Sequence, residues 1–89
     1  MGERLSVEYS RKFLKQAARL PQRIIEQAEL REDLFRDSPF DPRLETHKLH
    51  GEEKDVWSFS INRSYRIKFI FLGKNKVLFL EVGTHNIYK

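Results

Sequence analysis

The chain has 89 residues, of which 39% are hydrophobic, 34% charged and 12% aromatic, a balance that predicts one small globular domain spanning residues 1–89. It has no cysteine, which excludes disulfides, Cys-ligated metal centres and thiol nucleophiles. No apolar run approaches the roughly 20 residues of a membrane span. We therefore expect a cytoplasmic protein. Its net charge is +4, from 17 basic and 13 acidic residues. Nine of each lie in residues 1–46, so the excess lies in 47–89 with all three histidines, which favours a polyanionic partner.

The first half of the chain predicts a strand followed by two helices. Residues 5–9 alternate between apolar and polar side chains, which indicates a strand. Ser10 is a suitable N-terminal cap for a helix, and apolar residues then recur at helical spacing at positions 13, 14, 17 and 18. Because proline disfavours helical geometry in the residue before it and suits the first helical position, we expect a second helix to begin at Pro21. The run 37–39, Asp-Ser-Pro, ends this helix, and the pair forms a helical hairpin.

The second half predicts a loop followed by three strands. Residues 39–54 contain two prolines and few apolar residues, so we expect them to form mainly a loop. From residue 57 the apolar pattern has a period of two, which predicts strands at 57–61, 65–71 and 77–82 joined by turns at 62–64 and 73–76. The order β-α-α-β-β-β indicates an α+β fold, with an antiparallel sheet packed against the helical hairpin.

The two turns also predict the register of the strands. The pairs expected on the polar face are Ser60–Arg66, Ser58–Lys68, Lys68–Glu81 and Arg66–Gly83. The pairs expected on the core face are Ile67–Val82, Phe69–Leu80 and Phe71–Leu78. At one end the polar face is expected to carry the apolar residues Ile70, Val77 and Phe79.

This register gathers a candidate site around Arg66, at the end of the polar face. Its other expected members are Lys68 on the same strand, His85 and Tyr88 from the tail, His47, Lys48 and His50 from the long loop, and Arg63 from a turn. Arginine offers a fixed fork of donors to phosphate, histidine can transfer a proton near neutral pH, and tyrosine can stack or donate. These are the groups that a metal-free ribonuclease needs, and no cofactor is expected.

Several of these residues also have a structural interpretation. Lys68 could form a cross-strand ion pair with Glu81, worth less than about 1 kcal/mol, instead of contacting phosphate. Tyr88 could close an edge of the core, and His47 and His50 could be ordinary loop residues. A zinc site built from His47, His50 and His85 is disfavoured, because the spacing lies on no predicted helix and no carboxylate accompanies it.

Four strings of the sequence, His47–Gly51, Trp57–Ile61, Tyr65–Ile67 and Val82–Tyr88, together resemble the RelE/ParE superfamily of toxins from type II toxin–antitoxin systems. The order of the predicted elements agrees as well, so the resemblance extends over nearly the whole chain. The histidine in the tail makes the sequence more similar to the RelE/YafQ-like messenger RNA interferases than to the ParE inhibitors of gyrase.

The resemblance implies a microbial-ribonuclease-like fold that cuts messenger RNA on the ribosome and is inhibited by a cognate antitoxin, with a toxin–antitoxin heterotetramer as a candidate assembly. It implies that Arg66 acts at the scissile phosphate, that His85 transfers a proton, and that Tyr88 positions the nucleotide. His47 and His50 resemble loop histidines of the YafQ-like branch. The catalytic glutamate of the YoeB branch has no counterpart here, which leaves the general base unassigned.

Two other functions stay open at this point. A ParE-like protein would inhibit DNA gyrase without catalysis, and its helical hairpin would carry the effect. A degenerate toxin would serve as part of a repressor complex, although the presence of both Arg66 and His85 argues against it.

Overall fold

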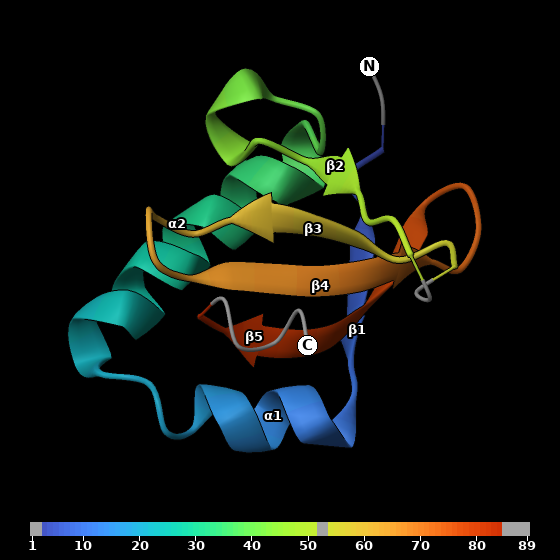
Figure 1. Ribbon diagram of the computed structural model, residues 1–89. Coiled ribbons are helices and arrows are strands. Elements are labelled where there is room, and N and C mark those ends of the chain that lie inside the picture. The colour runs from blue at the N-terminus through green and yellow to red at the C-terminus, as the bar shows by residue number, and fades with distance from the viewer. Residues whose placement is uncertain (1–2, 52–53, 85–89) are drawn as a thin grey trace.

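The computed structural model describes residues 3–51 and 54–84, which form two α-helices, one short 3-10 helix and five strands (Figure 1). In chain order the elements are β1 (Ser6–Tyr9), α1 (Arg11–Ala17), α2 (Gln22–Asp37), η1 (Pro42–Leu44), β2 (His47–Lys48), β3 (Trp57–Ser60), β4 (Arg66–Phe71) and β5 (Lys76–Gly83). Within these residues no helix is both long enough and apolar enough to cross a lipid bilayer.

The sheet has the strand order β1-β5-β4-β3-β2 and is mixed, which corrects the expectation of an antiparallel sheet. Strands β2 to β5 pair antiparallel, as hairpin connections require. Strand β1 instead runs parallel to β5, with Val7 opposite Val77. No turn joins β1 to its partner, so the local sequence holds no information about its direction. The predicted α+β class is confirmed.

A further strand, β2, lies within the segment expected to be a loop. It has two residues, His47 and Lys48, paired with Ser58 and Trp57 of β3. Neither residue is apolar, so β2 carries no period-two signal. The pairing holds the histidine-bearing segment against the sheet edge.

The helix boundaries follow from their caps. The Ser10 Oγ accepts a hydrogen bond of 2.9 Å from the Phe13 N–H, as expected of an N-terminal cap. The second helix begins at Gln22, because Pro21 keeps an extended ψ of 148° and is the capping residue rather than the first helical residue. It ends at Asp37, as predicted.

Helix α2 covers one face of the sheet, and α1 lies along the β5 side (Figure 1). Phe35 of α2 is fully buried, with its ring stacked on Phe59 at 4.5 Å and edge-on to Phe69 at 4.9 Å between centroids. Half of the other buried apolar residues of this core lie in β4 and β5, and the rest lie outside the strands: Ile67, Val77, Phe79 and Val82 in the strands, and Leu5, Phe13, Leu44 and Ile61 elsewhere. Burial of these side chains is the main stabilising contribution.

The register between β4 and β5 is as predicted at one end and shifted at the other. Arg66 lies opposite Gly83 and Lys68 opposite Glu81, but Phe69 lies opposite Phe79 instead of Leu80. The turn has three residues, 73–75, because the Leu72 N–H bonds the Lys76 carbonyl at 2.8 Å. The turn is thus one residue longer than predicted, and a bulge between Lys68 and Phe69 restores the predicted register at the other end of the strands.

The shift also changes the faces of two residues. Val77 pairs with Phe71 and Phe79 pairs with Phe69, and both Val77 and Phe79 are fully buried on the core face. The apolar end of the opposite face is therefore made by the half-buried pair Ile70 and Leu78. The expectation that Val77 and Phe79 belong to the polar face was wrong because it assumed a two-residue turn.

Helix α1 protects the part of β5 that extends beyond β1. The Ser10 Oγ donates to the Leu80 carbonyl at 2.9 Å, and the Gln16 Oε1 accepts from the Val82 N–H at 2.8 Å. These side chains replace the missing neighbouring strand, so the backbone groups of the edge are satisfied.

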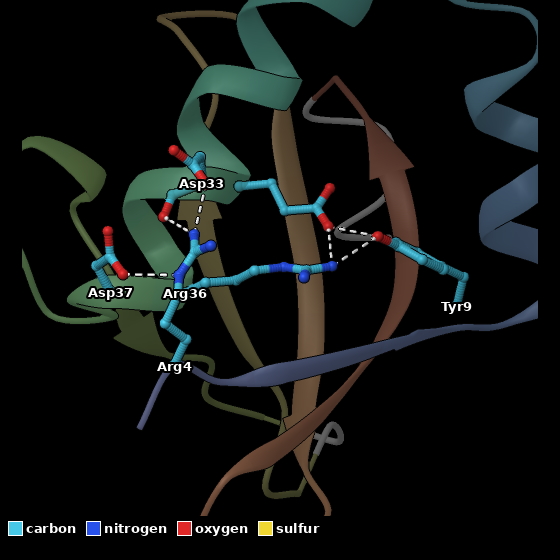
Figure 2. Close-up of polar contacts among 6 residues, drawn as sticks. Arg4, Tyr9, Asp33, Arg36 and Asp37 are labelled. Carbon is cyan, nitrogen blue, oxygen red and sulfur yellow. Dashed lines mark hydrogen bonds and ion pairs between the residues drawn. The ribbon is translucent and has the colours of Figure 1, made fainter. Parts of the chain in front are cut away.

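Strand β1 is joined to α2 by a polar network (Figure 2). The Arg4 guanidinium contacts Asp33 at 2.5 Å and Asp37 at 2.7 Å. The Arg36 Nη2 donates to Glu32 at 3.0 Å, and the Tyr9 hydroxyl donates to the same carboxylate. Partial burial and this hydrogen bond raise the pKa of Tyr9. The network therefore holds β1, whose direction no turn fixes, against α2.

Candidate functional site

The Arg66 side chain is held in place on the sheet face opposite α2. Its Nη1 donates to the Ser60 Oγ at 2.6 Å and to the Asn62 carbonyl at 2.8 Å. The Ser60 hydroxyl in turn donates to the same carbonyl at 2.7 Å. Because Ser60 is the cross-strand partner of Arg66, the register itself sets the first of these bonds. Arg66 is half-buried, so its orientation is fixed while part of it stays accessible.

The turn after β3 supplies the second anchor. The Asn62 Oδ1 accepts from the N–H groups of Ser64 and Tyr65 at 2.8 and 2.9 Å, which closes a local turn. The Asn62 Nδ2 donates to Gln27 of α2 at 2.7 Å, so the turn is also fixed to the helix. Asn62 was not among the predicted site residues. Its position in a turn near the predicted central arginine was the signal that could have identified it.

Lys68 lies on the same face and is buried, with 2% of its side chain exposed. Its Nζ lies 3.6 Å from one carboxylate oxygen of Glu81, and Lys12 of α1 lies 3.2 Å from the other. The predicted Lys68–Glu81 ion pair is confirmed. A buried ammonium group requires such a partner, since burial of an uncompensated charge is costly. The contact of Lys68 with phosphate stays a prediction.

Four residues form a row across this face of the sheet. His47 pairs with Ser58, Ser58 with Lys68, and Lys68 with Glu81. Paired residues point to the same side of a sheet, and neighbouring strands lie about 4.8 Å apart. The backbone of His47 is therefore about 10 Å from that of Lys68. His47 is exposed, and its Nδ1 lies 2.9 Å from the Glu45 carbonyl oxygen.

The remaining predicted site residues are not gathered in this row. Lys48 pairs with Trp57, so the alternation of side chains directs it to the other face, and its Nζ lies 3.5 Å from Asp55. His50 is exposed in the loop after β2, and Arg63 is exposed in the turn after β3. His85 and Tyr88 lie outside the described residues. Their roles stay predictions.

This face can bind an anion. Arg66 presents a planar fork of five N–H donors, of which Nη1 makes the two bonds above. A fixed fork suits the oxygens of a phosphate group better than a flexible lysine does. Exposed His47 adds a group that can transfer a proton. Among residues 3–51 and 54–84, no three His, Asp or Glu side chains lie close enough together to hold a metal ion.

No protein-family model matches the sequence, and no curated protein sequence matches it significantly. Solved structures do match. A YoeB/ParE toxin from Agrobacterium tumefaciens superposes with a TM-score of 0.77 and 15% identity, over 91% of this chain and 99% of that one. YafQ from E. coli strain BL21(DE3) superposes with a TM-score of 0.77 and 17% identity, over 94% of this chain and 97% of that one.

A third similar structure is an archaeal RelE–RelB complex from Pyrococcus horikoshii OT3, with a TM-score of 0.71 and 15% identity, over 90% of this chain and 93% of that one. All three similarities cover nearly the full length of both chains. The resemblance predicted from four short strings is thereby confirmed in the fold, and this chain has the fold of the RelE/ParE toxins.

Proposed function

We propose that this protein is the toxin of a type II toxin–antitoxin system and that it cleaves messenger RNA on the ribosome without a metal ion. The observation that carries the proposal is the Arg66 guanidinium, fixed by Ser60 and Asn62 on an accessible face of a RelE/ParE fold. The proposed substrate places the protein in the cytoplasm, with the ribosome and messenger RNA as partners.

The proposed reaction is an internal transesterification of RNA. A base removes the proton from the ribose 2′-OH, and the 2′-oxygen attacks the adjacent phosphorus to form a bond. The phosphorus–5′-oxygen bond breaks, and an acid protonates the departing oxygen, leaving a 2′,3′-cyclic phosphate. Arg66 stabilises the charge on the phosphorane. The resemblance assigns proton transfer to His85 and nucleotide positioning to Tyr88. His47 and His50 are the other histidines available.

Arg63, Lys48 and Lys68 are the proposed additional contacts to the RNA backbone. Arg63 fits this role best, because it is exposed beside the Arg66 anchor. Lys48 could reach RNA only beyond the sheet edge, since it belongs to the opposite face. Lys68 would act through its charge from beneath the surface.

The proposed regulator is an antitoxin protein. Two similar structures are named as complexes of this kind, DinJ–YafQ and RelE–RelB. By analogy, an antitoxin would bind this chain and block the Arg66 face, and a heterotetramer of two toxins and two antitoxins is one possible assembly.

The test is a reconstituted translation reaction on one defined messenger RNA, with cut sites mapped by primer extension. Wild type is compared with Arg66→Ala, with Arg66→Lys, which keeps the charge and removes the fork, and with Arg23→Ala, an exposed arginine of α2. We expect cuts at ribosome-occupied codons with wild type and Arg23→Ala, and a loss of at least about 100-fold with Arg66→Ala, in line with one lost transition-state donor.

Full-length message in the presence of folded wild-type protein would reject the nuclease. Inhibition of gyrase supercoiling that survives Arg66→Ala would then favour the ParE-like alternative. Circular dichroism and thermal unfolding of each variant show that a loss of cleavage is not a loss of fold.

A further inference from the structure

The row of side chains on the Arg66 face continues beyond the sheet onto α1. From His47 to Glu81, each member of the row belongs to a different strand. Helix α1 lies along the β5 side of the sheet (Figure 1), and the Nζ of its Lys12 lies 3.2 Å from Glu81 Oε1. Arg66 lies two residues before Lys68 in β4, and side chains two residues apart in a strand point to the same face. The Arg66 guanidinium therefore lies beside a row that runs from β2 to α1.

The orientation of α1 directs Lys12 toward the Arg66 face. Residues four apart lie on the same side of a helix, and Gln16, four residues after Lys12, accepts a hydrogen bond from the Val82 N–H at the edge of β5. Both side chains therefore point toward β5, Gln16 to its backbone and Lys12 to the carboxylate of Glu81. The Lys12 side chain is 67% exposed, so its ammonium group is accessible to a ligand on this face.

The charges at this end of the row favour an anionic ligand. Glu81 lies between two lysines, with one carboxylate oxygen 3.6 Å from Lys68 and the other 3.2 Å from Lys12. A lone carboxylate would repel a phosphate group here, but the two ammonium groups more than compensate it. Lys68 is buried and acts through its charge, whereas Lys12 can reach a phosphate directly. The contact of so exposed a lysine with Glu81 contributes little to stability, so structural support alone does not account for it.

We propose that Lys12 binds a phosphate of the RNA substrate that neighbours the phosphate held by Arg66, so that α1 forms one side of the RNA-binding surface. The identity of the ligand rests on the proposed function. The RNA strand then crosses the β-strands along the row, from His47 at the β2 edge to Lys12 on α1. Three strand spacings, or about 14 Å, separate β2 from β5, which leaves room for more than one nucleotide. Lys12 is a binding residue in this arrangement and takes no part in proton transfer.

The first test measures binding of a labelled single-stranded RNA of about eight nucleotides to the full chain by fluorescence anisotropy. Its 2′-hydroxyl groups are methylated, so it cannot be cleaved. At low ionic strength, Lys12→Met should raise the Kd at least about fivefold. The slope of log Kd against log salt concentration should fall by about 0.7, the value for one phosphate contact to a single strand. Because a phosphate contact carries no sequence information, the loss should be equal for two oligonucleotides of different sequence.

Two further variants serve as controls. Lys12→Arg keeps the positive charge, so its Kd should stay within about twofold of wild type. Lys74→Met removes an exposed lysine from the turn between β4 and β5, at the other end of β4 from Arg66, and it should also change the Kd less than about twofold. Thermal unfolding of each variant shows whether it is folded under the conditions of the binding assay.

The second test measures cleavage of messenger RNA on the ribosome. Lys12→Met should raise the KM for ribosomes that carry the message at least about threefold and leave kcat within about twofold, because Lys12 lies away from the reacting atoms. A loss of kcat at constant KM would overturn the proposal. So would equal Kd values for Lys12→Met and Lys74→Met, an unchanged salt slope, or no binding of the oligonucleotide by wild type at low salt. The binding assay involves no cleavage, so failure of the Lys12 contact and failure of the nuclease are observed separately.

Discussion

Removal of the Glu81 carboxylate should destabilise the protein more than removal of the lysine that it neutralises. Glu81→Gln leaves Lys68 buried beside a neutral amide, whereas Lys68→Met replaces the lysine with an apolar chain of similar shape. At 3.6 Å the Lys68–Glu81 attraction is about 4.6 kcal/mol for an effective dielectric constant of about 20. Loss of one partner of a buried pair costs about 3–5 kcal/mol, and because Glu81 is 20% exposed we expect about 2–4 kcal/mol for Glu81→Gln.

The Lys68→Met variant should lose about 1 kcal/mol or less, since an apolar replacement removes the cost of burying the charge. The double variant Lys68→Met/Glu81→Gln should then be more stable than Glu81→Gln alone. Lys12→Met is the matched control, because its contact with Glu81 involves a side chain that is 67% exposed, and it should cost less than about 0.5 kcal/mol.

The assay is equilibrium unfolding in urea, followed by the fluorescence of Trp57, the one tryptophan of the chain. For a small domain the slope m is about 1 kcal/mol/M, so the expected loss for Glu81→Gln lowers the midpoint by about 2–4 M, or leaves the variant unfolded without denaturant. A loss below about 0.5 kcal/mol for Glu81→Gln, or a double variant no more stable than it, would refute the view that Glu81 compensates a buried charge.

Three further outcomes follow from single contacts. Asn62→Ala removes two turn bonds and the bond to Gln27, and should cost about 1–2 kcal/mol in urea unfolding and weaken RNA cleavage through Arg66. Phe35→Ala should cost about 3–5 kcal/mol in the same assay, because the ring is fully buried. The side chain and backbone N–H of Arg43 lower the pKa of Asp41 to about 2. The ionised Asp41 carboxylate therefore contributes fully to stability above about pH 3.8, and this contribution is lost as the pH falls through about 2. The stability of Asp41→Asn should not show this loss in acid.

Each outcome has a result that would contradict it. An unchanged midpoint for Asn62→Ala would show that the turn forms without its side chain. A loss under about 1 kcal/mol for Phe35→Ala would mean that the core collapses around the missing ring. Identical acid transitions for wild type and Asp41→Asn below the ordinary carboxylate range would show that the Arg43 contact contributes nothing in solution.

The local sequence pattern was sufficient to predict the elements that are neighbours along the chain. The period of two from Trp57 onward predicts β3, β4 and β5, and the loop at 62–64 places Ser60 opposite Arg66, as the structure has them. Ser10 caps α1 as its side chain predicts. These features depend on interactions between residues close in sequence, so the sequence by itself determines them.

Contacts between distant residues were decided by the tertiary structure. The parallel direction of β1, the pairing of β2 and the bulge that moves Phe79 to the core depend on segments that meet only after folding. The same holds for the Arg66 site: its arginine could be identified from the sequence, but its anchor at Asn62 and the burial of Lys68 could not. The physical reason is that a turn or a period constrains its neighbours alone, whereas burial and charge compensation depend on what the rest of the chain brings alongside.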